Sequence, residues 1–97
     1  MKVAFLDRDG VINVDSGYVH HRDNFVFTEG CTEALQLLEQ KGFALIIVTN
    51  QSGIGRNYYS EQDYQQLTSW YREQLLQHGI AIAGIYHCPH APEALCD

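Results

Sequence analysis

The chain is 97 residues long, carries a formal net charge of −6 and has 45% hydrophobic residues. This size and composition predict one small globular domain. The six lysines and arginines form no basic run, which argues against the cationic face that nucleic-acid binding needs, and no apolar run approaches the ~20 residues of a membrane span. Three cysteines, an odd number, and no recognisable export signal favour a cytoplasmic protein over a disulfide framework.

Strands and helices are predicted to alternate along the chain. Short apolar, β-branched runs predict strands over residues 3–6 and 43–48, and residues 80–86 supply one or two further strand candidates. Helical spacing of apolar residues predicts helices over residues 30–41 and 60–78. Thr28 is a candidate cap for the first helix, and Ser60 with Asp63 resembles a capping box for the second. Residues 10–27, rich in turn formers, predict an irregular loop or hairpin.

This alternation predicts an α/β fold with a Rossmann-like parallel sheet, right-handed crossovers and flanking helices. The buried helix faces are predicted to be Cys31, Ala34, Leu35 and Leu38 in the first helix and Tyr64, Leu67, Tyr71 and Leu75 in the second. Ligands of such sheets bind beyond the carboxyl ends of the strands.

Two polar clusters fall at those carboxyl ends. Asp7 and Asp9 follow the first strand, while Thr49 and Asn50 follow the second in a segment predicted to turn. Side chains at i and i+2 of an extended segment share a face, and two carboxylates that close repel unless a cation or a shared proton relieves them. A single Asp-x-Asp would more often be two solvated aspartates, but the convergence of both clusters favours a metal site, an acid–base pair or both.

At this point the sequence resembles a known family. Phe-Leu-Asp-Arg-Asp-Gly at residues 5–10 and Ile-Val-Thr-Asn-Gln-Ser-Gly at residues 47–53 are similar to the haloacid-dehalogenase superfamily of phosphohydrolases. Residues 7–19, together with Cys-Pro-His at residues 88–90, resemble the subgroup of heptose 1,7-bisphosphate phosphatases and histidinol-phosphate phosphatases. The resemblance covers nearly the whole chain.

The resemblance implies Mg²⁺-dependent hydrolysis of a small phosphorylated sugar through an aspartyl-phosphate. The implied substrate is the 7-phosphate of D-glycero-D-manno-heptose 1,7-bisphosphate, a precursor of the lipopolysaccharide core. Histidinol phosphate is the close alternative. A truncated, non-catalytic binding or assembly module is the alternative from another functional class.

The resemblance also assigns roles to residues. Asp7 matches the nucleophile, Asp9 the acid and base, and Thr49 a hydroxyl that donates to the phosphoryl oxygens. Mg²⁺ is expected at the Asp7 carboxylate and the Asp9 backbone carbonyl. The expected substrate-binding residues are Arg8, Asp15, Ser16, Gly17, Tyr18, Asn50, Gln51 and Ser52. Of these, Arg8 is expected to be solvated and only a weak candidate for steering phosphate.

A second metal is suggested near the carboxyl end of the chain. Cys88, His90 and Cys96 offer thiolate and imidazole ligands at short spacing, which suits a structural Zn²⁺. A closed zinc site takes four ligands, and only three are visible here. A structural Zn²⁺ is therefore expected in the parent fold, and in this chain its fourth ligand is missing.

The resembled enzymes continue with a lysine motif and a further aspartate motif that these 97 residues lack. We therefore expect residues 1–97 to form one incomplete domain, with a substrate-binding flap over residues 10–27 and the start of a zinc loop over residues 88–97. Its isolated activity is expected to be low, because a fixed cation and part of the Mg²⁺ site are missing. An open sheet edge is expected, through which the chain could self-associate.

Overall fold

A three-stranded parallel sheet organises the computed structural model, which describes residues 2–89. The strands are β1 (Lys2–Leu6), β2 (Phe43–Asn50) and β3 (Ile82–Cys88), in the order β1-β2-β3. Both neighbouring pairs are parallel. The predicted α/β class and parallel sheet are thus confirmed.

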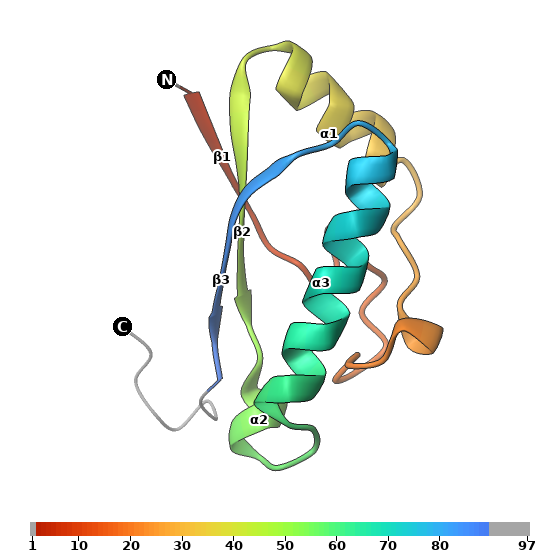
Figure 1. Ribbon diagram of the computed structural model, residues 1–97, viewed down its shortest axis with the longest axis vertical. Helices are drawn as coiled ribbons and strands as arrows, with labels where there is room; N and C mark the ends of the chain where they lie inside the picture. Colours follow the sequence, from red (N-terminus) through yellow and green to blue (C-terminus); the bar gives the residue numbers. More distant parts are fainter. Residues whose placement is uncertain (1, 90–97) are drawn as a thin grey trace.

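The two longer helices, α1 (Cys31–Gln40) and α3 (Glu61–Gln77), lie on the same face of this sheet (Figure 1). Each strand is added on the same side of the preceding one, so two right-handed crossovers must place both helices on one face. The shorter elements are a 3₁₀ helix, η1 (Arg22–Asn24), and α2 (Ser52–Gly55). No helix within residues 2–89 is long and apolar enough to cross a membrane.

The core fills the space between the helices and the sheet. Leu45 and Ile47 of β2 are completely buried there. All four residues predicted to form the buried face of the second helix, now α3, are buried. In α1, Cys31 and Leu35 are buried as predicted, but Ala34 is exposed. Leu38 is half-buried against the core, so the covered stripe of α1 is narrower than the sequence suggests.

The opposite face of the sheet is apolar and open within the described part of the chain. Phe5 of β1, Val48 of β2 and Tyr86 of β3 are 70%, 48% and 63% exposed. Val48 and Tyr86 are register partners, so their side chains lie next to each other across two strands. Within residues 2–89, β1 and β3 each pair with β2 only, which matches the expected open edge.

Two boundaries differ from the sequence prediction. β2 continues through Thr49 and Asn50, because β3 extends beside it and pairs with both residues. Thr28 does not cap α1, since its hydroxyl donates to the carbonyl oxygen of Val11. The N-cap is Gly30, whose φ of 78° is in the left-handed region that favours glycine.

The segment from residue 10 to residue 27 is irregular, as predicted. Isolated bridges join Asn13 to Asp9 and to Phe27, and η1 forms its only helical turn. We call residues 10–27 the flap segment. It lies beyond the carboxyl end of β1, which brings it against the site described next.

Candidate active site

The carboxyl ends of β1 and β2 bring Asp7 and Thr49 to one cavity. Leu6 pairs with Ile47, so the residue that follows β1 lies beside the last residues of β2. Asp7, Thr49 and Asn50 line a cavity of about 350 Å³ together with residues at the end of β3. The Asp7 side chain is exposed, and its Oδ1 accepts a hydrogen bond from the backbone N–H of Arg8 at 2.8 Å. This bond orients the carboxylate at the rim of the cavity.

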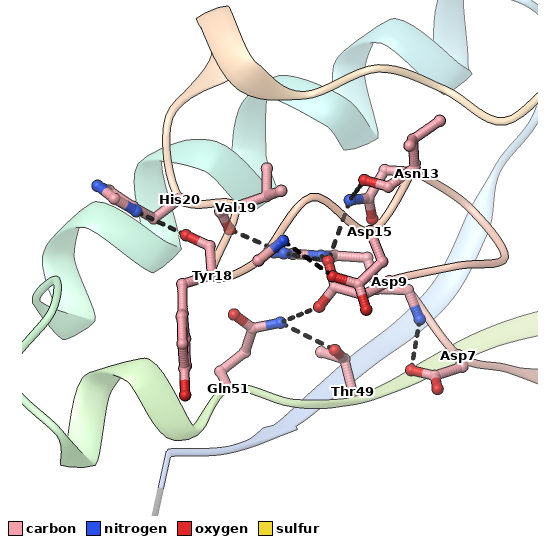
Figure 2. A network of polar contacts seen from close by, with 12 residues as sticks. Asp7, Asp9, Asn13, Asp15, Tyr18, Val19, His20, Thr49 and Gln51 are labelled. Carbon is pink, nitrogen blue, oxygen red and sulfur yellow. Dashed lines mark hydrogen bonds and ion pairs between the residues drawn. The ribbon is translucent and has the colours of Figure 1, made fainter.

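Asp9 is held by several donors at once (Figure 2). Its Oδ1 accepts from Arg8 Nη2 at 2.8 Å, from Arg8 Nε at 3.3 Å and from Asn13 Nδ2 at 3.0 Å. Among the residues that the structure describes, its Oδ2 accepts from Gln51 Nε2 alone, at 3.3 Å. Oδ1 is therefore fully occupied, and Oδ2 is the oxygen that remains available to exchange a proton.

Gln51 connects the two polar clusters. Its Nε2 donates to Thr49 Oγ1 at 2.9 Å as well as to Asp9 Oδ2, and Figure 2 shows its side chain lying between the two. Gln51 and Thr49 are 2% and 3% exposed, so little water competes for these bonds. The predicted meeting of the two clusters at one sheet edge is thus confirmed.

Arg8 is buried, so the expectation that it is solvated is wrong. Its side chain is 0% exposed and lies 5.8 Å from the centre of the Phe25 ring. Besides its bonds to Asp9, Nη2 donates to the carbonyl oxygen of Val19 at 2.8 Å. Arg8 lines neither cavity of the site; it ties Asp9 to the flap segment from within.

The flap segment borders a second cavity, of about 270 Å³, on the Asp9 side. Asp15, Gly17 and Tyr18 line it opposite residues 50–52. Asp15 Oδ1 accepts from the backbone N–H of Gly17, and this short turn places Tyr18 with a φ of 48° at the cavity wall. Ser16, also expected to bind substrate, is exposed and lines neither cavity of the site.

Two residues of the site were not recognised from the sequence. Asn13 lies in the stretch predicted to be rich in turn formers, but it is completely buried and donates to Asp9. Tyr59 was not singled out; it is 6% exposed, lines the second cavity and donates to Gln51 Oε1 at 2.5 Å. The one sequence feature that marks Tyr59 is its position just before the capping box, and this position does not predict a contact with Gln51.

Only some of the expected metal ligands lie within the part of the chain that the structure describes. Within residues 2–89 no group of three or more His, Cys, Asp and Glu side chains could hold a metal ion. Of the expected zinc ligands, Cys88 ends β3, whereas His90 and Cys96 lie outside the described residues. Zinc therefore stays a prediction.

The oxygen donors at the site fit Mg²⁺. Asp7 Oδ1 is occupied by the Arg8 N–H, and Oδ2 has no partner within residues 2–89. Mg²⁺ in phosphate-handling sites is held by one or two carboxylates plus phosphate oxygens and water, so a single exposed carboxylate is a suitable anchor.

A parallel sheet with two aspartates and a threonine at its carboxyl edge has the arrangement that the resemblance to haloacid-dehalogenase phosphatases implied. The chain belongs to the polynucleotide kinase 3 phosphatase family, whose model matches residues 2–83. It is 55% identical over 93 residues to D-glycero-beta-D-manno-heptose-1,7-bisphosphate 7-phosphatase of Haemophilus ducreyi, covering 95% of this chain and 51% of that protein. It is 50% identical over 95 residues to the alpha-D-manno enzyme of Photorhabdus laumondii, covering 98% and 52%.

The chain shares its fold with a solved structure whose name is similar to those of these relatives. The crystal structure of D,D-heptose 1.7-bisphosphate phosphatase from B. bronchiseptica, complexed with magnesium and phosphate, superposes with a TM-score of 0.91 at 33% identity. The match covers 99% of this chain and 54% of that one. This chain thus spans about half the length of the relatives it matches.

Proposed function

We propose that this chain carries the nucleophile and the acid–base residue of a Mg²⁺-dependent phosphatase that hydrolyses a phosphomonoester of a small sugar bisphosphate. The observation that carries the proposal is that Asp7 and Thr49 line one cavity while Gln51 joins Thr49 to Asp9. The names of the relatives support a narrower substrate, the 7-phosphate of D-glycero-D-manno-heptose 1,7-bisphosphate.

The geometry supports a two-step reaction. An Asp7 carboxylate oxygen attacks phosphorus, the bond between phosphorus and the sugar oxygen breaks, and Asp9 Oδ2 gives its proton to that oxygen. Water then attacks the phosphorus of the aspartyl-phosphate, the bond between phosphorus and the Asp7 oxygen breaks, and Asp9 Oδ2 takes one of the water's protons. Inorganic phosphate leaves, and both carboxyl groups return to their starting states.

Charge stabilisation comes from donors and from the metal. Thr49 and Asn50 line the cavity in which the phosphoryl group would lie, and their hydroxyl and amide groups are the donors offered to it. Asp7, through its carboxylate, and Asp9, through its backbone carbonyl, are the residues that would hold Mg²⁺. When bound, the ion supplies positive charge for the phosphoryl oxygens.

The proposal is tested by replacing the nucleophile. The Asp7→Asn substitution is introduced into the protein in the form in which its host organism produces it. It is expected to lower phosphate release by roughly 10³-fold or more, because the amide cannot form the covalent intermediate. The assay offers the alpha and beta anomers of the heptose bisphosphate and, separately, histidinol phosphate. Asp23→Asn is the matched control, since Asp23 is an exposed aspartate of η1.

Each result has a distinct reading. Release from histidinol phosphate but not from the heptose substrates would replace the narrow substrate assignment and keep the phosphatase. An unchanged rate in Asp7→Asn would overturn the nucleophile. A parent protein that is inert on all three substrates and forms a stable oligomer would favour the non-catalytic assembly module. Zinc analysis of the same preparation tests the separate zinc prediction.

A further inference from the structure

Tyr59 lies between the flap segment and the candidate active site. Its ring stacks on that of His20, with centroids 4.8 Å apart and planes 6° from parallel. On its other side the hydroxyl donates to Gln51 Oε1. Gly53 makes this position available, because a Cβ there would lie 2.1 Å from Tyr59 Cε1. Tyr59 is therefore seated in a space that the surrounding chain has shaped for it.

The hydrogen bonds that follow from Tyr59 have a fixed direction. Gln51 could in principle present either its amide oxygen or its NH₂ group to Asp9. In the structure Oε1 faces Tyr59, whose hydroxyl donates to it, and the NH₂ group lies on the Asp9 side, with Nε2 3.3 Å from Asp9 Oδ2. The same Nε2 then donates to Thr49 Oγ1.

As a result, the hydroxyl hydrogen of Thr49 is left without an acceptor among residues 2–89. Its oxygen accepts from Gln51, and within residues 2–89 its hydroxyl makes no hydrogen bond as a donor. Its proton is therefore available to the cavity that Thr49 shares with Asp7. Burial raises the pKa of Tyr59 to about 12, so its hydroxyl remains a donor at neutral pH.

We propose that Tyr59 is a positioning residue that sets the direction of the chain from Tyr59 through Gln51 to Thr49, so that the Thr49 hydroxyl donates to the bound phosphoryl group. This inference rests on the proposed phosphatase function. Tyr59 acts through Gln51, and its hydroxyl is not assigned a contact with the reacting atoms. The stacking on His20 links the same residue to the flap segment.

Tyr59→Phe keeps the ring and its stacking and removes only the hydroxyl. We expect kcat to fall about fivefold, the size of one neutral hydrogen bond, with KM nearly unchanged, because the correctly directed Thr49 hydroxyl matters most in the transition state. Tyr58→Phe is the matched control. Tyr58 is 56% exposed and lines neither cavity of the site, so its variant should retain the parent kcat.

A second measurement does not depend on activity. Proton–nitrogen spectra report hydrogen exchange at the side-chain amide of Gln51, assigned by its disappearance in Gln51→Leu. Exchange is expected to be several-fold faster in Tyr59→Phe than in the parent or in Tyr58→Phe, because Oε1 loses its donor. Thermal denaturation of each variant identifies a general loss of structure.

The two proposals fail in different ways. If the parent hydrolyses no phosphomonoester, the proposed function fails, and the Gln51 exchange rates still decide whether Tyr59 orients the amide. If the parent is active and Tyr59→Phe matches Tyr58→Phe in kcat, the positioning role is overturned. Unchanged Gln51 exchange in Tyr59→Phe would overturn it as well.

Discussion

Arg8 shows how one buried side chain fixes the local geometry of the site. Its guanidinium joins Asp9, next to it in the sequence, to the Val19 carbonyl eleven residues further along. Guanidinium suits this task, because its planar array of N–H donors can serve two acceptors at once. The bond to Val19 holds the flap segment, and the bonds to Asp9 determine which of its oxygens faces the cavity.

Replacing Arg8 with methionine is expected to destabilise the fold. Methionine fills similar space but leaves the Asp9 carboxylate and the Val19 carbonyl without their donors. Removing one partner of a buried pair costs about 3–5 kcal/mol, and we expect about 3 kcal/mol here, because Asp9 keeps some exposure and its bonds to Asn13 and Gln51. Urea denaturation measures the change in the free energy of unfolding.

Arg22→Met is the control for the loss of a positive charge. Arg22 is exposed in η1, and substitutions at such positions change stability by about 0.5 kcal/mol or less. Equal losses in the two variants would show that overall charge, rather than the Asp9 and Val19 bonds, is responsible for the effect.

The residues of the site were predictable to different degrees. Asp7, Asp9 and Thr49 could be placed together because they follow apolar strands, and parallel strands end at the same edge of a sheet. The burial of Arg8 could not be predicted, since a charged side chain between two aspartates is usually solvated. Tyr59 could not be connected to Gln51 either, because that contact depends on how closely the ring approaches Gly53.

At the scale of elements, α3 begins with a complete capping box. Ser60 Oγ accepts from the Asp63 backbone N–H at 3.0 Å, and the Asp63 carboxylate accepts from the Ser60 backbone N–H at 3.0 Å. These bonds satisfy two donors that have no partner inside the helix. Since Tyr59 immediately precedes the box, the start of α3 also sets where the Tyr59 hydroxyl lies.

Ser60→Ala is expected to lower the free energy of unfolding by about 1 kcal/mol, the usual cost of losing a side-chain N-cap. Ser69→Ala is the matched control. Ser69 lies exposed in the middle of α3, where alanine has the higher helix propensity, so this variant should be as stable as the parent or slightly more so. Thermal or urea denaturation of both variants measures the difference.

The same box predicts a dependence on pH. The backbone N–H of Ser60 lowers the pKa of the Asp63 carboxyl below its ordinary value. A group whose pKa is lowered on folding contributes stability above its unfolded pKa, and this contribution is lost as pH falls through the folded pKa. The stability that Asp63 adds should therefore be present at neutral pH and disappear in acid. Urea denaturation of the parent and of Asp63→Asn at neutral and at acidic pH measures this contribution, and a stability difference between the two proteins that is the same at both pH values would contradict it.

Elements were predictable where the local signal and the packing agree. The capping box and the apolar stripe of α3 were both readable from residues 60–75, and both are present. The end of β2 was not, because Thr49 and Asn50 favour turns by themselves and are kept extended by pairing with β3. The N-cap of α1 was also misassigned, since Thr28 bonds to Val11 in the flap segment instead.

At the scale of the whole molecule, the sheet has two unequal faces. α1 and α3 cover one face (Figure 1). Phe5, Val48 and Tyr86 remain exposed on the other face within residues 2–89. Strands of a parallel sheet are usually covered on both faces. This chain spans about half the length of its relatives. How much the residues on the open face contribute to its free energy of unfolding can be measured by substitution.

Two neighbouring residues of β2 provide that measurement. Ile47 is 0% exposed and faces the helices, whereas Val48 points to the open face. Ile47→Ala should cost about 3 kcal/mol or more, because it removes buried methyl groups and leaves a cavity. Val48→Ala should cost about 1 kcal/mol or less, mainly through lower strand preference, because its methyl groups already contact water. Both substitutions replace a β-branched residue of the same strand with alanine, so the difference between their effects reports how deeply each face is buried.

Equal losses in the free energy of unfolding of the 97-residue chain would mean that the second face is covered in solution, for example by another copy pairing through the open sheet.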